Sequence, residues 1–242
     1  MAHFYLSLEL ASAVVGDLVA VTDAEARHAV TVGRLRVGET VSVGNGAGLV
    51  VSGAVRSAES AAFTIQVDSV TFEPAPSPAI WLAQALAKGD RDELAIQMAT
   101  ELGVDGVIPW AAGRSIVRWE GAKVRKHEER WASILREASK QSLRARIPEL
   151  LPLASSAALA KLGTELRLVV LDPMARQPLS SLRPDGRDLL LVVGPEGGIA
   201  PAELARLAAV GAGSFSLGRT VLRTSTAGPA AISVLNGALG RW

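Results

Sequence analysis

The sequence contains no cysteine and only three histidines, His3, His28 and His127, which are scattered along its 242 residues. The absence of cysteine excludes disulfides, thiolate nucleophiles, cysteine-ligated zinc and iron–sulfur clusters. With so few histidines we also expect no metal site. No stretch approaches the roughly 18–20 consecutive apolar residues of a membrane-spanning helix, so we expect no membrane partner. The first ten residues lack the basic segment and apolar core of a signal peptide, which predicts a cytoplasmic protein.

An excess of charge of one sign is also lacking, because 25 Lys and Arg face 24 Asp and Glu, a formal net charge of +1. This balance alone argues against an avid nucleic-acid binder. It is uneven, however: residues 114–146 hold ten Lys or Arg and four Glu, a local net charge of +6, so the rest of the chain carries −5. Such a cluster is expected where a protein contacts phosphates, although a solvated helix face gives the same pattern. Aromatic residues make up 4%, which leaves few rings for stacking on bases.

The hydrophobic pattern changes at the proline-rich segment EPAPSP, residues 73–78. Before this segment, short runs of alternating apolar residues lie around residues 4–8, 41–51 and 63–67, and a short helix capped by Asp23 lies between them. Alternation of this kind predicts half-buried strands, and several short strands with one helix favour a small β-barrel. The proline-rich segment is therefore the best candidate for a linker between two domains.

From residue 79 onward the expected strands alternate with helices, which predicts an α/β layer fold. The continuous apolar runs at 167–171 and 189–193 suit parallel strands that are buried on both faces. Asp90 with Glu93 three residues later is a capping-box pattern. We expect further strands at 80–86, 107–108 and 214–217, and helices that end near 103, span 123–143, span 201–211 and begin near 225.

Two segments are candidates for ligand binding. The turn Gly194-Pro195-Glu196-Gly197-Gly198 follows the apolar run at 189–193, and the carboxyl ends of buried strands are where α/β sheets bind ligands. It matches neither a dinucleotide fingerprint nor a phosphate-binding loop. The segment 216–227, SLGRTVLRTSTA, leads into a helix whose first N–H groups are open to polar ligand atoms. In this interpretation Arg223, which lies just before the helix, would direct its guanidinium toward a substrate. The alternatives are an ordinary strand–helix turn and a solvated arginine.

Two smaller groups of cations are candidates for phosphate contacts. The segment Lys88-Gly89-Asp90-Arg91 precedes a predicted helix, where two cations would lie near a phosphate at the helix N-terminus. A plain helix cap with surface charges is equally consistent with it. Arg34 lies with Arg27, His28 and Arg36 near the short helix of the predicted barrel, and His28 either contacts RNA or is a structural histidine.

Five segments in fixed order carry a resemblance to a known family. The chain resembles the bacterial RsmE family, the 16S ribosomal RNA (uracil-N3)-methyltransferases of the SPOUT (trefoil-knot) class, over nearly its full length. Each segment alone is weak evidence for the family, whereas all five in this order and with this spacing are specific evidence for it. The segments are HAVTVGRLRVGE at 28–39, QALAKGDRDELAIQMATELGVDGVIP at 84–109, RWASILREASKQSLRARIPE at 130–149, LLLVVGPEGGIAPAEL at 189–204 and SLGRTVLRTSTA at 216–227.

The resemblance implies a two-domain RNA-modifying enzyme. Residues 1–72 would form a PUA-like RNA-binding barrel, and residues 73–242 a SPOUT-type α/β methyltransferase domain with a C-terminal trefoil knot. The implied reaction is S-adenosylmethionine-dependent methylation of N3 of a specific uridine in 16S ribosomal RNA, free or in the small ribosomal subunit. The implied assembly is a homodimer.

Carried over residue by residue, the resemblance also implies roles for individual side chains. Arg223 would be catalytic. Ser225 stands where family members often have Glu, which leaves the proton acceptor unassigned, and Val32-Gly33-Arg34 replaces the family's VLR. The implied cofactor-binding residues are Leu171, Gly194, Pro195, Glu196, Gly197, Gly198, Leu217, Gly218, Val221, Leu222 and Ala227. The implied RNA-binding residues are Arg34, Lys88, Arg91, Arg114, Gln141 and Arg144.

Two alternative functions stay open from the sequence. One is a knotted methyltransferase that acts on another RNA position, which the glycine-rich turn does not discriminate. The other is a non-catalytic RNA-binding factor in ribosome assembly, which the intact turn at 194–198 and Arg223 disfavour.

Overall fold

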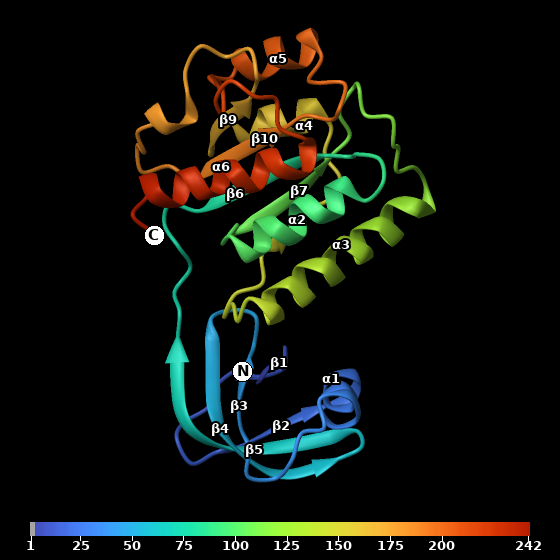
Figure 1. The fold of residues 1–242 in the computed structure, drawn as a ribbon, viewed down its shortest axis with the longest axis vertical. Helices are drawn as coiled ribbons and strands as arrows, with labels where there is room; N and C mark the ends of the chain where they lie inside the picture. The colour runs from blue at the N-terminus through green and yellow to red at the C-terminus, as the bar shows by residue number, and fades with distance from the viewer. Residues whose placement is uncertain (1–2) are drawn as a thin grey trace. The chain divides into compact units, whose positions relative to one another are not determined.

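A computed structural model describes residues 3–242, and the chain forms two compact units (Figure 1). The first unit consists of residues 3–75 together with Ser139–Ile147, and the second of Pro76–Ala138 and Pro148–Trp242. The chain leaves the first sheet within the proline-rich segment 73–78. In this part of the chain no helix has the length and apolar character needed to cross a membrane.

The first unit is built on a five-stranded sheet with the order β1-β3-β4-β5-β2. β1 pairs with β3 in parallel and the other pairs are antiparallel. Apolar residues alternate along β4 and β5, and their buried members, among them Val51, Phe63 and Ile65, form the core of the unit. The strands are β1 (His3–Leu6), β2 (Leu18–Thr22), β3 (Thr40–Gly44), β4 (Leu49–Glu59) and β5 (Ala62–Phe72).

The short helix of the first unit differs from the sequence expectation at its start. α1 (Asp23–Arg27) continues into a π-helical turn, His28–Val32. The prediction that Asp23 caps this helix was wrong, because Asp23 is its first residue, with a φ of 62°, and Thr22 occupies the cap position. The pattern of apolar residues located the helix, but the local backbone conformation decided which residue begins it.

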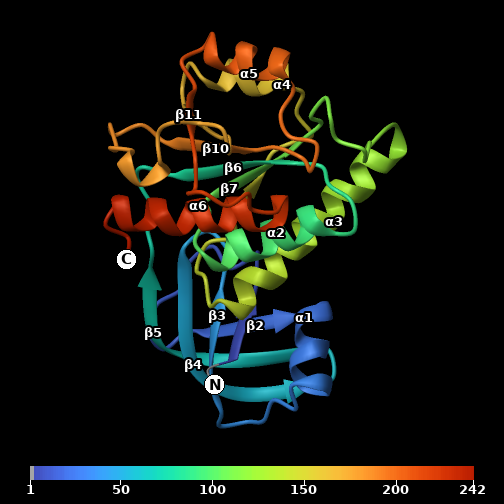
Figure 2. The same cartoon turned by 45° about the horizontal axis from the view of Figure 1, so that its top comes forward.

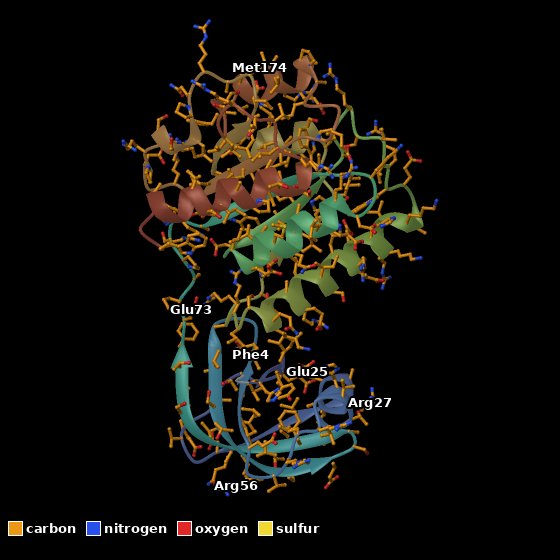
Figure 3. The ribbon with its side chains drawn as sticks, viewed as in Figure 1. Phe4, Glu25, Arg27, Arg56, Glu73 and Met174 are labelled. Carbon is orange, nitrogen blue, oxygen red and sulfur yellow. The ribbon has the colours of Figure 1, made fainter. Side chains whose placement is uncertain are left out.

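The segment Ser139–Ile147 joins the first unit through backbone and side-chain bonds. Gly48 N–H donates to the Ala145 carbonyl at 3.0 Å, and Ile147 N–H donates to the Gly46 carbonyl at 3.0 Å. Arg146 Nε donates to the Glu73 carbonyl at 2.9 Å, and Lys140 Nζ pairs with the Glu25 carboxylate at 3.0 Å. Glu25 and Glu73 are labelled in Figure 3. Part of the strongly basic stretch of the sequence thus belongs to the first unit.

The second unit is built on a six-stranded parallel sheet with the order β11-β9-β10-β6-β7-β8. The predicted α/β class is confirmed. β10 is fully buried, because continuous apolar strands need cover on both faces. The strands are β6 (Ile80–Ala85), β7 (Gly106–Trp110), β8 (Glu149–Leu150), β9 (Arg167–Leu171), β10 (Leu189–Val193) and β11 (Gly213–Phe215).

Helices cover both faces of the parallel sheet (Figure 2). α2 and α6 pack together on one face, and α4 and α5 lie on the other. The Arg130 guanidinium of α3 pairs with Glu93 of α2 at 3.0 Å. A 3-10 turn, Leu179–Ser181, lies between β9 and β10. The helices are α2 (Arg91–Glu101), α3 (Ala122–Gln141), α4 (Ser156–Leu162), α5 (Pro201–Ala208) and α6 (Thr224–Ala238).

The predicted capping box places Asp90 correctly at the N-cap of α2, but the expected hydrogen bond to its side chain does not form. Asp90 has a φ of 56°. Asp92 stabilises this turn instead, since its carboxylate accepts from the N–H groups of Ala87, at 3.2 Å, and Glu93, at 2.9 Å. Burial raises the pKa of Asp92 against the opposing effect of these bonds.

The strand order places a topological switch point at the middle of the sheet. β6 is followed outward by β7 and β8, whereas β9 and β11 lie on the other side of β10. Ligands of open α/β sheets bind beyond the carboxyl ends of the strands at such a point. A ligand site is therefore expected at the segments that follow β9, β10 and β11.

Candidate functional site

A cavity of about 730 Å³ lies at the carboxyl ends of β9, β10 and β11. Its lining comes from the segment after β9, the turn after β10, the loop after β11 and the first residues of α6. The structure thus brings together most of the residues for which the sequence predicted cofactor contacts. Those that line the cavity are Leu171, Gly194, Pro195, Glu196, Gly198, Leu217, Val221, Leu222 and Ala227, together with Arg223.

The turn at 194–198 has its shape because glycine occupies two critical positions. A Cβ on Gly194 would lie 2.7 Å from the Ile199 side chain, and Gly198 has a φ of 71°. Gly198 N–H donates to the Pro195 carbonyl at 2.8 Å and closes the turn. Glycine is therefore needed at 194 for a close approach and at 198 for a left-handed conformation.

Three cations predicted to bind RNA lie around this same turn. Arg91 Nη1 pairs with Glu196 Oε1 at 2.8 Å, and the Lys88 N–H donates to that oxygen at 3.3 Å. Arg114 Nη1 donates to the Gly197 carbonyl at 3.1 Å. Lys88 and Arg91 come from the start of α2 and the loop before it, and Arg114 from the loop after β7, so their convergence on one turn is a product of the fold.

The Glu196 carboxylate is stabilised in its charged form. Burial alone would raise the pKa of Glu196, but its own backbone N–H, the Arg91 guanidinium and the Lys88 N–H all donate to the carboxylate. These bonds hold the pKa of Glu196 below its ordinary value. A carboxylate of this kind is a poor proton acceptor and a good partner for a cation.

A buried carboxylate, that of Glu203, holds the loop that carries Arg114. Glu203, on α5, accepts from Gly113 N–H at 2.8 Å and from Ala200 N–H at 3.1 Å. Because Gly113 immediately precedes Arg114, these bonds join the start of α5 to the loop that carries Arg114. The turn at 194–198 is thus supported from the loops after β6 and β7 as well as by its own backbone.

The opposite wall of the cavity is the loop that leads into α6. Arg223 occupies the N-cap position of α6 and is solvent-exposed, and its carbonyl accepts from the N–H groups of Thr226 and Ala227. Val221 is 77% exposed although it lines the cavity. A cation and exposed apolar side chains therefore lie together on this wall of the cavity.

Some cavity residues were missed from the sequence. Asp172, Pro173 and Met174 follow β9 and line the cavity, as do Phe215 and Thr224. Met174, labelled in Figure 3, is 86% exposed. The signal was present, because residues 172–174 follow a continuous apolar run at the same sheet edge as the predicted turn.

Other predicted residues lie outside the cavity lining. Gly197 lies against Arg114 instead, and Gly218 has a φ of 104° in the loop after β11. Arg34, Gln141 and Arg144 belong to the first unit, where Arg34 and Gln141 are exposed. Ser225 is buried in the first turn of α6. In the described part of the chain no group of three or more His, Asp or Glu lies together as a metal site would require.

Comparison with known proteins identifies the family. The RNA methyltransferase domain family matches residues 73–236, and the RNA methyltransferase PUA domain family matches residues 21–68. A ribosomal RNA small subunit methyltransferase E from Mycobacterium tuberculosis is 39% identical over 231 residues, covering 93% of this chain and 88% of the relative. The protein of that name from Bacillus subtilis is 30% identical, covering 98% and 96%.

Solved structures agree with the sequence comparison. A ribosomal RNA small subunit methyltransferase E from Neisseria gonorrhoeae, solved bound to S-adenosyl methionine, has a TM-score of 0.88 at 28% identity and covers 98% of both chains. A putative methyltransferase from Legionella pneumophila in complex with the same cofactor has a TM-score of 0.87 at 28% identity, also over 98% of both chains.

The family resemblance predicted from the five sequence segments is confirmed. Both domain matches fall on the segments that carried it, and the relatives align over almost the whole chain. This chain therefore belongs to the ribosomal RNA small subunit methyltransferase E family and is an RNA methyltransferase.

Proposed function

We propose that this protein transfers a methyl group from S-adenosylmethionine to N3 of one uridine in the 16S RNA of the small ribosomal subunit. The observation that carries the proposal is the cavity between the turn at 194–198 and the loop that ends at Arg223, in a chain of this family. The names of the relatives and the cofactor in their solved structures support it.

The lining of the cavity fits an adenosine-containing cofactor. Its volume of about 730 Å³ lies within the roughly 300–1,000 Å³ typical of small-molecule sites. Apolar side chains such as Leu171, Leu217 and Leu222 suit the faces of a purine, and the glycines of the turn expose backbone groups for its polar edges. We assign the predicted cofactor contacts to these residues and add Met174 and Phe215.

The chemistry assigns Arg223 to the substrate. When bound, S-adenosylmethionine supplies an electrophilic methyl group on a positively charged sulfur. The uracil N3–H must lose its proton before N3 attacks, and negative charge then develops toward O2 and O4 of the ring. A guanidinium on the cavity wall stabilises this charge more in the transition state than in the ground state. Arg223 is the catalytic residue of the proposal.

The proton acceptor lies outside the protein in this proposal. Ser225 replaces the carboxylate that relatives often carry, and it is buried in α6. Glu196 lines the cavity, but its lowered pKa and its pairing with Arg91 make it a weak base. Solvent or a substrate phosphate therefore takes the proton, which leaves positioning as the main source of rate.

RNA contacts are assigned to both units. Lys88, Arg91 and Arg114 gather at the turn of the second unit. Arg34, Gln141 and Arg144 belong to the first unit. Phosphate contacts by the five Lys and Arg residues of this set make binding depend steeply on salt. An affinity that does not change with salt would contradict this assignment.

The proposal also includes the domain architecture and the assembly that the family resemblance implies. Residues 1–72 form a PUA-like RNA-binding barrel, and residues 73–242 form a SPOUT-type domain in which the chain after β10 makes a trefoil knot. Two copies assemble as a homodimer in the cytoplasm. The matches to a PUA domain at 21–68 and to an RNA methyltransferase domain at 73–236 support this division.

Two measurements test the proposed function. Titration calorimetry with S-adenosylmethionine should give binding heat, and its absence would favour a non-catalytic RNA-binding factor. Incubation with small ribosomal subunits or free 16S RNA, followed by nucleoside mass spectrometry and mapping, should give one N3-methyluridine. A methyl group at another atom or nucleotide would replace the proposed substrate with the other alternative.

A further inference from the structure

A buried glutamine lies behind the cavity and joins its two walls. Gln84, in β6, is 0% exposed, and its Nε2 donates to Thr224 Oγ1 at 2.9 Å. Thr224 Oγ1 in turn donates to the Gly194 carbonyl at 2.9 Å. Gly194 begins the turn after β10, and Thr224 is the first residue of α6, next to Arg223. One chain of two hydrogen bonds therefore connects both walls to a central strand.

The direction of these bonds is determined by their ends. The Gly194 carbonyl only accepts, so the Thr224 hydroxyl must donate to it and its oxygen must accept from Gln84. Gln84 Nε2 also donates to the Ala85 carbonyl at 3.2 Å, a second group that only accepts. The amide nitrogen of Gln84 must therefore face Thr224, and a side chain that cannot donate breaks the chain of bonds.

The surrounding packing makes the connection rigid. Gln84 is the register partner of Val193, the residue before Gly194. A Cβ on Gly228, one turn further along α6, would lie 3.2 Å from two methyl carbons of Leu82, so α6 lies directly on β6 at this point. Close packing of this kind fixes the position of the helix start relative to the strands.

The hydrogen bonds of Gln84 are one-sided. Its Oε1 is buried without a hydrogen-bond partner among the described residues. A buried polar atom without a partner is unfavourable, and an apolar side chain at this position would avoid it. The favourable interactions of Gln84 are directed at Thr224 and Ala85, which points to a role in positioning.

We propose that Gln84 is a positioning residue that acts through the Thr224 hydroxyl to set the distance between the turn at 194–198 and Arg223. The inference rests on the proposed function, because it concerns how cofactor and substrate are aligned between these two walls. Loss of the hydrogen bonds lets the start of α6 and the turn move independently. Cofactor affinity and the rate at saturating cofactor then fall together.

The test uses substitutions that keep shape and change hydrogen bonding. Thr224→Val removes the hydroxyl, Thr224→Ser keeps it, and Gln84→Met replaces the amide with an apolar chain of similar length. Thr100→Val is the matched control, since Thr100 is a buried threonine whose hydroxyl donates within α2 to the Ile96 carbonyl. Each variant is assayed in the full-length protein for cofactor Kd, for kcat at saturating cofactor and for thermal unfolding.

Thr224→Val and Gln84→Met should each weaken cofactor binding about 5–10-fold. This factor corresponds to the loss of one hydrogen bond that contributes about 1–1.4 kcal/mol. Each should also lower kcat at saturating cofactor. Thr224→Ser should stay within about twofold of wild type, and Thr100→Val should change only the unfolding temperature. The double variant Gln84→Met with Thr224→Val should lose little more than either single variant, because both break one chain of bonds.

Three results would overturn the inference: wild-type Kd and kcat in Thr224→Val, no rescue by Thr224→Ser, or losses that multiply in the double variant. The wild-type protein separates this failure from that of the proposed function. If the wild type binds no S-adenosylmethionine, both fail. If it binds and methylates normally while Thr224→Val is unaffected, only the positioning role fails.

Discussion

The two walls of the cavity differ in how firmly the rest of the protein supports them. The turn at 194–198 receives bonds from Lys88, Arg91, Arg114 and Thr224. The loop from Leu217 to Arg223 is supported at its two ends. Ser216, which precedes it, exchanges backbone bonds with Gln177 and Leu179, and Thr224, which follows it, bonds to Gln84. Between these ends Val221 is 77% exposed.

This difference suggests a division of labour. A wall supported by many bonds is preformed and supplies affinity without an ordering cost on binding. A wall with open side chains has few buried contacts, and segments of this kind adapt to a ligand at low cost. We therefore expect changes in the turn to act on cofactor affinity, and changes near Arg223 to act on the chemical step. Four predictions test this contrast.

Arg223→Ala should have the largest effect and should act on the chemical step. Removing one group that stabilises developing charge lowers kcat by about 10²–10³-fold. The cofactor Kd should stay within a few-fold of wild type, because the backbone of the wall is unchanged. Single-turnover methylation and calorimetry measure the two effects. Arg219→Ala, an exposed arginine of the same loop outside the cavity lining, serves as control, and near-normal turnover in Arg223→Ala would contradict the division.

Gly194→Ala should act on affinity instead. The new Cβ would lie 2.7 Å from the Ile199 side chain, which also lines the cavity, so the side chain or the turn must shift and the lining changes shape. We expect about tenfold weaker binding with a smaller change in kcat at saturating cofactor. Gly237→Ala is the matched control, because a Cβ there meets nothing within 4 Å; alanine inside α6 should raise stability by about 0.5–1 kcal/mol. Equal losses in both variants would mean that the turn is not preformed.

Arg34→Gln and Arg144→Gln test cations of the first unit, which belong to neither wall. Each should weaken RNA binding a few-fold and reduce the slope of log K against log salt by about one, while the cofactor Kd stays at the wild-type value. Filter binding over a salt series measures this. Arg187→Gln is the control, since Arg187 pairs with Asp185 before β10, at the opposite end of that strand from the turn. An unchanged slope in Arg34→Gln and Arg144→Gln would remove these residues from the RNA surface.

Glu196→Gln should have the smallest effect, because the Arg91–Glu196 pair is partly exposed and such pairs contribute little. We expect less than about threefold weaker cofactor binding. The pKa of Glu196 in the folded protein lies below its ordinary value of 4.5, so the pair stabilises the turn above that pH and is lost only as the pH falls through the lowered pKa. Binding measured from pH 8 to 5.5 should therefore show no step from this group. A step in that range that Glu196→Gln abolishes would mean that its pKa is raised.

Apolar patterning predicted the second unit well where strands are continuous runs. β9 and β10 have the predicted bounds, because strands buried on both faces leave an unbroken apolar signal. β2 and α4 were not predicted, since β2 is half exposed and the seven residues of α4 form only about two turns. Asp90 is the N-cap residue of α2 as predicted, but its left-handed backbone, which local sequence does not reveal, comes without the expected side-chain capping bond.

The candidate site likewise has a part that could be predicted from the sequence and a part that could not. The turn at 194–198 and Arg223 were predicted, since each follows a strand and leads into a helix along a contiguous stretch of sequence. Their grouping in one cavity with Met174 depends on strand order, which places β9 between β10 and β11. The positions of Lys88, Arg91 and Arg114 around the turn depend on contacts between segments that are 83 or more residues apart in the sequence.

The family, the alternation of strands and helices, and the two segments proposed to carry the chemistry are all legible in the sequence, because these are properties of neighbouring residues. The side chains that connect these segments become visible only in the folded chain. Gln84 and Thr224 are 140 residues apart in the sequence and 2.9 Å apart in the fold. No local pattern marks such a pair, because its partners meet only when β6, β10 and α6 pack around one buried core.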